Sequence, residues 1–125
     1  MKKMYAAIAF LLLIPAVSVF YLYYLSSSCD SLADTFENVL YVAENNSEKL
    51  SSQFENAEKK WKKYEKTFAV SVNHAELDTV KQSMARAESY MKSDDISEFM
   101  CELKVVTDQI EHIKQLEYPT LQNIF

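Results

Sequence analysis

The chain has 125 residues, a formal net charge of −5 and no glycine, whereas average usage of about 7% would give roughly nine. Without glycine there is no glycine-rich phosphate-binding loop and no dinucleotide-binding fingerprint, because both need glycine at fixed positions. Tight-turn β architectures are disfavoured for the same reason, so we expect a single domain of helices joined by short turns.

The first segment is predicted to be a membrane anchor. Residues 4–25 carry no charge, and as a helix they would span roughly 33 Å, enough to cross a bilayer core of about 30 Å. Lys2 and Lys3 precede this stretch and Asp30 is the first charge after it, which places the N-terminus in the cytoplasm. We therefore expect a single-pass anchor at residues 1–25 in the cell membrane, with the rest of the chain extracytoplasmic.

A cleaved signal peptide is the alternative to an anchor. Ser26, Ser27 and Ser28 form a small-x-small site directly before Cys29, and cleavage there would release a secreted protein. The apolar stretch is longer than the secretory core of about 7 to 15 residues and ends in bulky tyrosines, which favours the anchor. Lipid modification of Cys29 is a variant of this alternative, although its usual signal has an aliphatic residue where Ser26 stands.

Residues 26–118 show the apolar spacing of amphipathic helices. Four stripes follow one another in steps of three and four residues. They consist of Leu22, Leu25, Cys29, Leu32, Phe36, Val39 and Ala43; of Leu50, Phe54, Ala57, Trp61, Tyr64 and Phe68; of Leu77, Val80, Met84, Ala87 and Met91; and of Ile96, Phe99, Leu103, Val106, Ile110 and Ile113. The first stripe continues the span without a break, so the span and the first outer helix are predicted to be one rod.

Polar residues between the stripes indicate where the helices begin. Ser47, Asn73 and Asp95 are the expected N-caps of the three later helices. Pro119 is expected to end the last helix. It would leave an apolar tail, 119–125, that either plugs the base of the bundle or lies at the lipid interface.

The predicted fold class is all-α: an N-terminal transmembrane helix followed by an antiparallel up-down bundle of four helices at residues 26–118. The connections are too short for parallel neighbours. A looser pair of helical hairpins is the alternative arrangement.

Two histidines stand near acidic residues at helical spacing. His74 is followed by Glu76 and Asp78, and Asp108 precedes His112 by one turn, so each histidine shares a helix face with an aspartate. Together the two pairs would offer nitrogen and oxygen ligands to a divalent metal ion. The alternative is structural, because acidic residues also favour the positive end of a helix that begins at His74. We favour the structural interpretation and expect no metal and no cofactor.

Lysines crowd the second outer helix, at Lys59, Lys60, Lys62, Lys63 and Lys66. Trp61 and Tyr64 between them belong to the apolar stripe, so the lysines are interpreted as the solvated face of an amphipathic helix. This helix descends toward the membrane in the predicted topology. The Lys59 to Lys66 cluster therefore has a second interpretation, which is contact with anionic headgroups or wall polymers.

The two cysteines, Cys29 and Cys101, fall at different heights of the predicted bundle, well beyond the limit of about 7 Å between the Cα atoms of a disulfide. We expect no disulfide within the chain. Cys29 is predicted to pack as a small apolar residue or to meet its counterpart in a homodimer.

Composition and motifs disfavour nucleic-acid binding and catalysis. From Ser26 onward the chain has 11 basic and 18 acidic residues, which is the opposite of a nucleic-acid footprint. No serine or cysteine nucleophile has a histidine at a recognisable spacing, and neither HExxH nor the paired Glu-x-x-His of di-iron bundles is present. We expect no enzymatic activity and no nucleic-acid partner.

The order of features resembles a known family. A short anchor, helices that carry Trp61, the string His74-Ala75-Glu76-Leu77-Asp78 and the ending Glu117-Tyr118-Pro119-Thr120-Leu121-Gln122-Asn123-Ile124-Phe125 are similar to small membrane-anchored helical proteins of Gram-positive, clostridia-like bacteria, catalogued as a domain of unknown function. The resemblance implies an extracytoplasmic helical domain and a partnership with a small polytopic membrane protein. It implies no activity, catalytic residue or cofactor.

These observations favour a membrane-anchored extracytoplasmic protein that acts by protein–protein contact, as an accessory subunit or scaffold. Its expected partners are the membrane and another membrane protein, with a homodimer as a further option. The first alternative is a ligand- or metal-sensing module that uses His74 and His112. The second is a secreted or lipid-modified helical protein.

Overall fold

The protein is built from helices. A computed structural model describes residues 1–45 and 47–124, without the side chains of residues 47 and 117–124. Its elements are, in chain order, α1 (Lys2–Asn45), the 3-10 helix η1 (Ser47–Lys49), α2 (Leu50–Phe68), α3 (His74–Lys92) and α4 (Ile96–Ile124). The described residues contain no strand, and the all-α prediction is confirmed.

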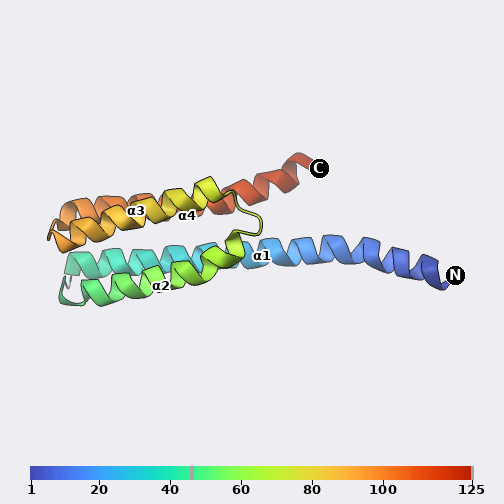
Figure 1. Cartoon of the computed structure of the whole chain (residues 1–125), viewed down its shortest axis with the longest axis horizontal. Helices are drawn as coiled ribbons and strands as arrows, with labels where there is room; N and C mark the ends of the chain where they lie inside the picture. The colour runs from blue at the N-terminus through green and yellow to red at the C-terminus, as the bar shows by residue number, and fades with distance from the viewer. Residues whose placement is uncertain (46, 125) are drawn as a thin grey trace.

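The longest helix, α1, joins the candidate span to the bundle. It runs unbroken for 44 residues, so the prediction of one rod is confirmed. Figure 1 shows its N-terminal part projecting beyond the other helices and its C-terminal part packed among them. The first 20 residues are all exposed, and this part of α1 is long and apolar enough to cross a membrane. Pro15 lies within it, where a membrane helix tolerates proline.

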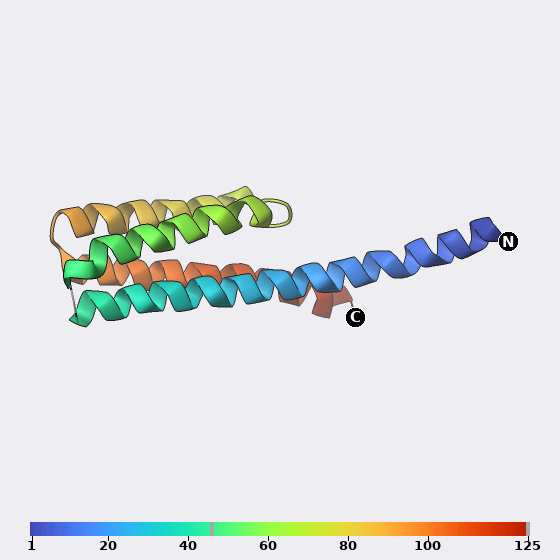
Figure 2. The ribbon, with the colours of Figure 1, turned by 90° about the horizontal axis from the view of Figure 1, so that it is seen from below.

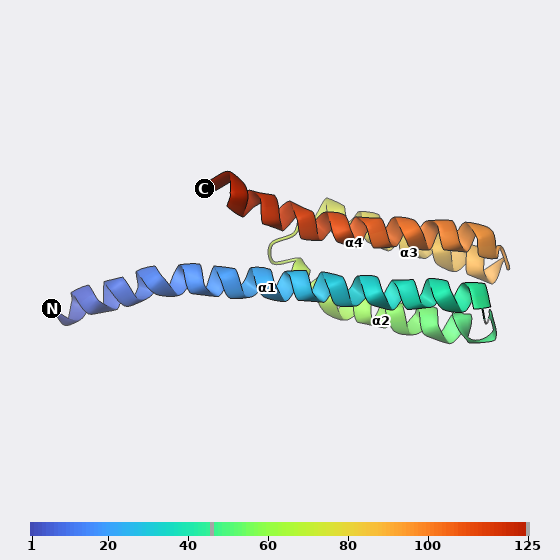
Figure 3. The ribbon, with the colours of Figure 1, turned by 180° about the vertical axis from the view of Figure 1, so that it is seen from behind.

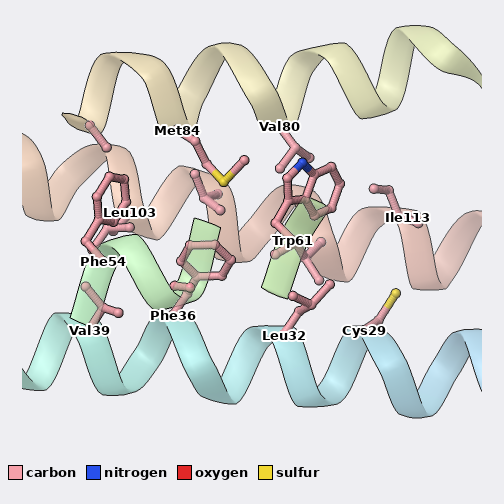
Figure 4. Packing of buried hydrophobic residues seen from close by; sticks show 14 of the residues in the cluster. Cys29, Leu32, Phe36, Val39, Phe54, Trp61, Val80, Met84, Leu103 and Ile113 are labelled. Atoms are coloured by element: carbon pink, nitrogen blue, oxygen red, sulfur yellow. The ribbon is translucent and has the colours of Figure 1, made fainter. Parts of the chain in front are cut away.

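The four predicted stripes meet in one hydrophobic core. Every member is buried except Leu22, Tyr64, Met91 and Ile96, which are half-buried. In Figure 4, Cys29 and Ile113 lie together at the end of the core nearer the span, and Phe54 and Leu103 lie together at the far end. The core therefore runs the length of the bundle and begins where the exposed part of α1 ends.

The helices pair as two hairpins. α1 lies beside α2 and α3 lies beside α4, as Figures 1 and 3 show, and the turned view of Figure 2 shows that α1 also runs along α4. The hairpins join mainly through α1 and α4, whereas α2 and α3 touch only sparsely. The seam between α2 and α3 is thus the loosest side of the bundle, as expected of the looser hairpin arrangement.

Side chains cap two helices as predicted. The Asn73 Oδ1 accepts a hydrogen bond from the backbone N–H of Ala75 at 3.0 Å, before α3. The Asp95 Oδ1 accepts one from the backbone N–H of Glu98 at 3.3 Å, at the start of α4. These bonds satisfy amide groups that have no partner inside a helix.

The end of α3 is a left-handed turn made without glycine. Asp94 has a φ of 60°, and its N–H donates to the Met91 carbonyl at 3.1 Å, while the N–H of Asp95 donates to the Tyr90 carbonyl at 2.9 Å. This pair of bonds is the Schellman motif, in which glycine usually occupies the left-handed position. Aspartate tolerates that conformation better than most residues do.

The predicted start of α2 is wrong. The N-cap position is not residue 47, because η1 intervenes and α2 begins only at Leu50. Lys49 stands at the N-cap position and makes no side-chain capping bond. A 3-10 turn of this kind is frequent at the N-terminus of an α-helix.

The predicted end of α4 is also wrong. The helix continues through Pro119 to Ile124. Proline removes one backbone hydrogen bond and kinks a helix, and this costs about 3 kcal/mol without always ending the helix. The predicted contacts of Leu121, Ile124 and Phe125 lie outside the described side chains.

Candidate functional site

The base of the bundle is the end at which α1 passes from the candidate span into the hydrophobic core. Leu25 is only 1% exposed, although it precedes the serine run of the candidate cleavage site. About one turn earlier, the Tyr21 hydroxyl lies 2.6 Å from the Ser71 Oγ and donates to the Thr67 carbonyl at 3.4 Å. These contacts hold the connection between α2 and α3, residues 69–73, against the end of the span.

A second contact ties α4 to the same end of α1. The Lys114 Nζ donates to the Asp30 Oδ1 at 2.7 Å. A partly exposed ion pair adds little stability alone. Its position is informative, since Asp30 is the first charge after the span and the pair joins residues from opposite ends of the chain.

Lysines from two helices form a cationic face beside the seam between α2 and α3. They line a shallow hollow of about 610 Å³ together with Glu65, and we define the cationic face as Lys59, Lys62, Lys63, Lys66 and Lys81. Glu65 pairs with Lys81 at 3.3 Å. Lys63 and Lys66 make no ion pair with any described residue. The hollow therefore carries a net positive charge on a chain that is acidic overall.

Lys60 does not belong to this face. Its Nζ donates to the Ser31 Oγ at 2.6 Å, to the Ser31 carbonyl at 3.2 Å and to the Thr35 Oγ1 at 2.8 Å. The interpretation of all lysines from Lys59 to Lys66 as one solvated face is therefore wrong for Lys60. Its partners lie on α1, and the spacing within α2 carries no information about them.

A smaller cavity, of about 130 Å³, opens between α2 and α3 next to the cationic face. Trp61 lines it and is fully buried, and its Nε1 has no hydrogen-bond partner among the described residues. In Figure 4 this nitrogen is directed toward α3, near Val80. Glu58 and Glu88 line the same cavity from α2 and α3. Burial, and then repulsion by Glu88, raise the pKa of Glu58 above its ordinary value.

The histidines and aspartates considered as metal ligands do not come together. His74, Asp78 and Asp108 are exposed, and the His112 Nε2 lies 3.9 Å from the Glu76 Oε2. Within the described part of the chain, no three His, Cys, Asp or Glu side chains are placed to hold a metal ion. The partner of His112 on α3 is therefore Glu76, and not His74 or Asp78. A single histidine–glutamate pair does not make a metal centre.

The cysteines occupy different environments at different heights. Cys29 is 1% exposed and lies beside Ile113 (Figure 4), whereas Cys101 is exposed on α4. Cys101 precedes Ile113 by twelve residues, or about 18 Å along a helix, which is too far for a disulfide with Cys29. The burial of Cys29 is typical of a small apolar core residue.

The base, the seam and the core all lie inside one family match. The family described as a domain of unknown function (DUF4363) matches residues 19–124. The chain belongs to this family. Because the match begins near the end of the candidate span and covers all the later helices, the DUF4363 domain consists of the bundle and its junction with the candidate span. Comparisons with curated proteins and with solved structures found no match.

Sequence reasoning missed two residues at the base of the DUF4363 domain. Tyr21 reads as an interfacial residue of the span, yet its hydroxyl reaches the connection between α2 and α3. In that connection Val70 is 80% exposed. No spacing in the sequence links Tyr21 to a residue 50 positions away, so the sequence held no signal for this contact.

Proposed function

We propose that this DUF4363 protein is a single-pass membrane protein, with its N-terminus in the cytoplasm, whose extracytoplasmic bundle acts by contact with another membrane protein, as an accessory subunit or scaffold, and not by catalysis. The continuity of α1 carries the proposal. Its surface changes from exposed and apolar to buried at Leu25, without a break in the helix. A partner that contacts both the exposed apolar part of α1 and the bundle would bind a single rigid surface, as a scaffold requires.

The contacts of the base support an uncleaved anchor. A cut directly before Cys29 would remove Leu25 and Ser28, which are 1% and 4% exposed, together with the hydrogen bonds of Tyr21. Because these residues cover the end of the core, their removal would expose it to water. This favours the anchored protein over the secreted or lipid-modified alternatives. The metal-sensing alternative has no such support, because the described residues form no group of three or more candidate ligands.

Site-specific photo-crosslinking in native membranes tests the proposal. A photoreactive residue is placed at Leu12 in the span or at Tyr41 on the bundle, positions that are equally exposed at 67%. We expect both probes to capture the same membrane protein, and identical samples without irradiation serve as the control. Adducts with lipid alone at Leu12, and no protein above the control at Tyr41, would refute an accessory or scaffold role.

A further inference from the structure

The cationic face lies at the end of the bundle nearer the span. Lys66 is in the last turn of α2, directly before the connection 69–73 that Tyr21 holds through Ser71. Lys62 and Lys63 lie about one turn, or 5 Å, further from that end, and Lys59 about one turn further again. The lysines are therefore stacked above the point where α1 enters the apolar region.

The membrane boundary falls at the same level, given the anchoring proposed above. A hydrocarbon core of about 30 Å takes up some 20 residues of helix, and the headgroups extend about 5 to 7 Å beyond it on each side. A core of that thickness, centred on the uncharged stretch 4–25, ends near residue 24, so Tyr21 and the connection 69–73 lie at its outer edge, about one helical turn, or 5 Å, below the headgroups. Val70, 80% exposed in that connection, is an apolar side chain at a depth where lipid can cover it.

Charge selects the lipid. Lys63 and Lys66 have no described ion-pair partner, and the hollow that they line holds only Glu65 as an opposing charge. Lysine stems are long and flexible enough to place their ammonium groups among headgroups one turn away. Lys59 and Lys81 remain within the range of about 8 to 10 Å over which charges interact at ordinary salt.

We infer that the cationic face and the tip of the connection 69–73 form a docking surface for anionic phospholipid headgroups of the membrane that holds α1. This inference rests on the proposed anchoring. Docking holds the end of the seam that lies next to the connection 69–73 against the bilayer. It leaves the opposite side of the bundle, formed by α1 and α4, for a protein partner.

The test uses the full chain in vesicles. Val70→Cys, in a Cys101→Ser background, is labelled with an environment-sensitive dye, since the remaining Cys29 is buried. Vesicles of phosphatidylcholine alone are compared with vesicles made of equal parts of phosphatidylcholine and phosphatidylglycerol. We expect the dye to report a more apolar environment with the anionic lipid than with the neutral lipid, and this difference to disappear between about 0.1 M and 1 M salt.

Removing three charges from the cationic face measures how much they contribute to docking. One triple variant changes Lys62, Lys63 and Lys66 to glutamine, and a matched control makes the same change at Lys49, Lys92 and Lys104, which lie in η1, α3 and α4 outside the cationic face. At about fivefold per lysine near an anionic surface, the first variant should lower the docked-to-undocked ratio about 100-fold. The control should change it by less than about fivefold.

Flotation after an alkaline wash separates the two proposals. A chain that fails to float with the vesicles contradicts the anchoring itself. A chain that floats but gives the same dye signal in neutral and anionic vesicles, or an equal loss in both triple variants, overturns the lipid surface alone. A signal that appears only when a soluble glycerol-phosphate polymer is added would overturn it too, in favour of a wall polymer.

Discussion

Leu25 is the first residue of α1 that belongs to the core of the bundle, and the substitution Leu25→Ala in the full chain tests this assignment. The side chain is 1% exposed at the base of the core, whereas Leu12 in the span is 67% exposed. The substitution removes three carbons, worth about 0.8 kcal/mol each, and leaves a cavity that adds to the cost. We expect a loss of about 2.5 to 4 kcal/mol for Leu25→Ala, and less than about 0.5 kcal/mol for Leu12→Ala.

The assay follows Trp61, which is the sole tryptophan and is fully buried in the bundle. Its fluorescence during heating in mild detergent reports the bundle and is blind to the span. For a domain of about 100 residues, each kcal/mol lowers the melting temperature by about 4 to 8 °C, so Leu25→Ala should melt at least 10 °C lower. Equal melting temperatures for Leu25→Ala and Leu12→Ala would refute the assignment of Leu25 to the core and, with it, the argument against cleavage before Cys29.

Two further predictions concern helix ends and pH. Asp94→Gly should stabilise the bundle by about 0.5 kcal/mol, because glycine adopts the φ of 60° without steric cost, while Asp95→Ala should destabilise it by about 1 kcal/mol through the lost cap; thermal melting of both variants checks the opposite signs. Because the pKa of Glu58 is raised above 4.5 in the fold, its contribution to stability falls as pH rises above 4.5. Glu58→Gln should therefore be slightly more stable than wild type at neutral pH, by less than about 1 kcal/mol for a partly exposed group, and equal to it below pH 4.5; an unchanged difference at both pH values would contradict this.

Apolar spacing predicted the core because the same rule acts along every helix. A residue every three or four positions lies on one face, and that face is buried whatever its partner is. Phe36, Trp61 and Leu103 could thus be assigned to the core without knowing which helices touch. The caps at Asn73 and Asp95 were predictable for a related reason, since a capping bond joins residues two or three positions apart.

What spacing could not predict depends on contacts between helices. Lys60 immediately precedes Trp61, and only the position of α1 decides that its ammonium group meets Ser31 and not water. His112 lies near Glu76, and only the orientation of α3 about its own axis decides which acidic residue of α3 faces His112. Pro119 illustrates a different limit, because proline weakens a helix locally and the surrounding chain decides whether the helix continues.

The junction at Tyr21 and Leu25 also limits how the protein can move. A flexible linker would let a bundle turn freely above its anchor, but α1 has no break there, and the one proline in α1 is Pro15, inside the span. The Tyr21 hydroxyl and the Asp30 carboxylate fasten this part of α1 to the connection between α2 and α3 and to α4. A rotation or axial shift of the N-terminal part of α1 would therefore carry the whole base with it, so a partner that holds this part of α1 also fixes the height and the orientation of the bundle relative to it.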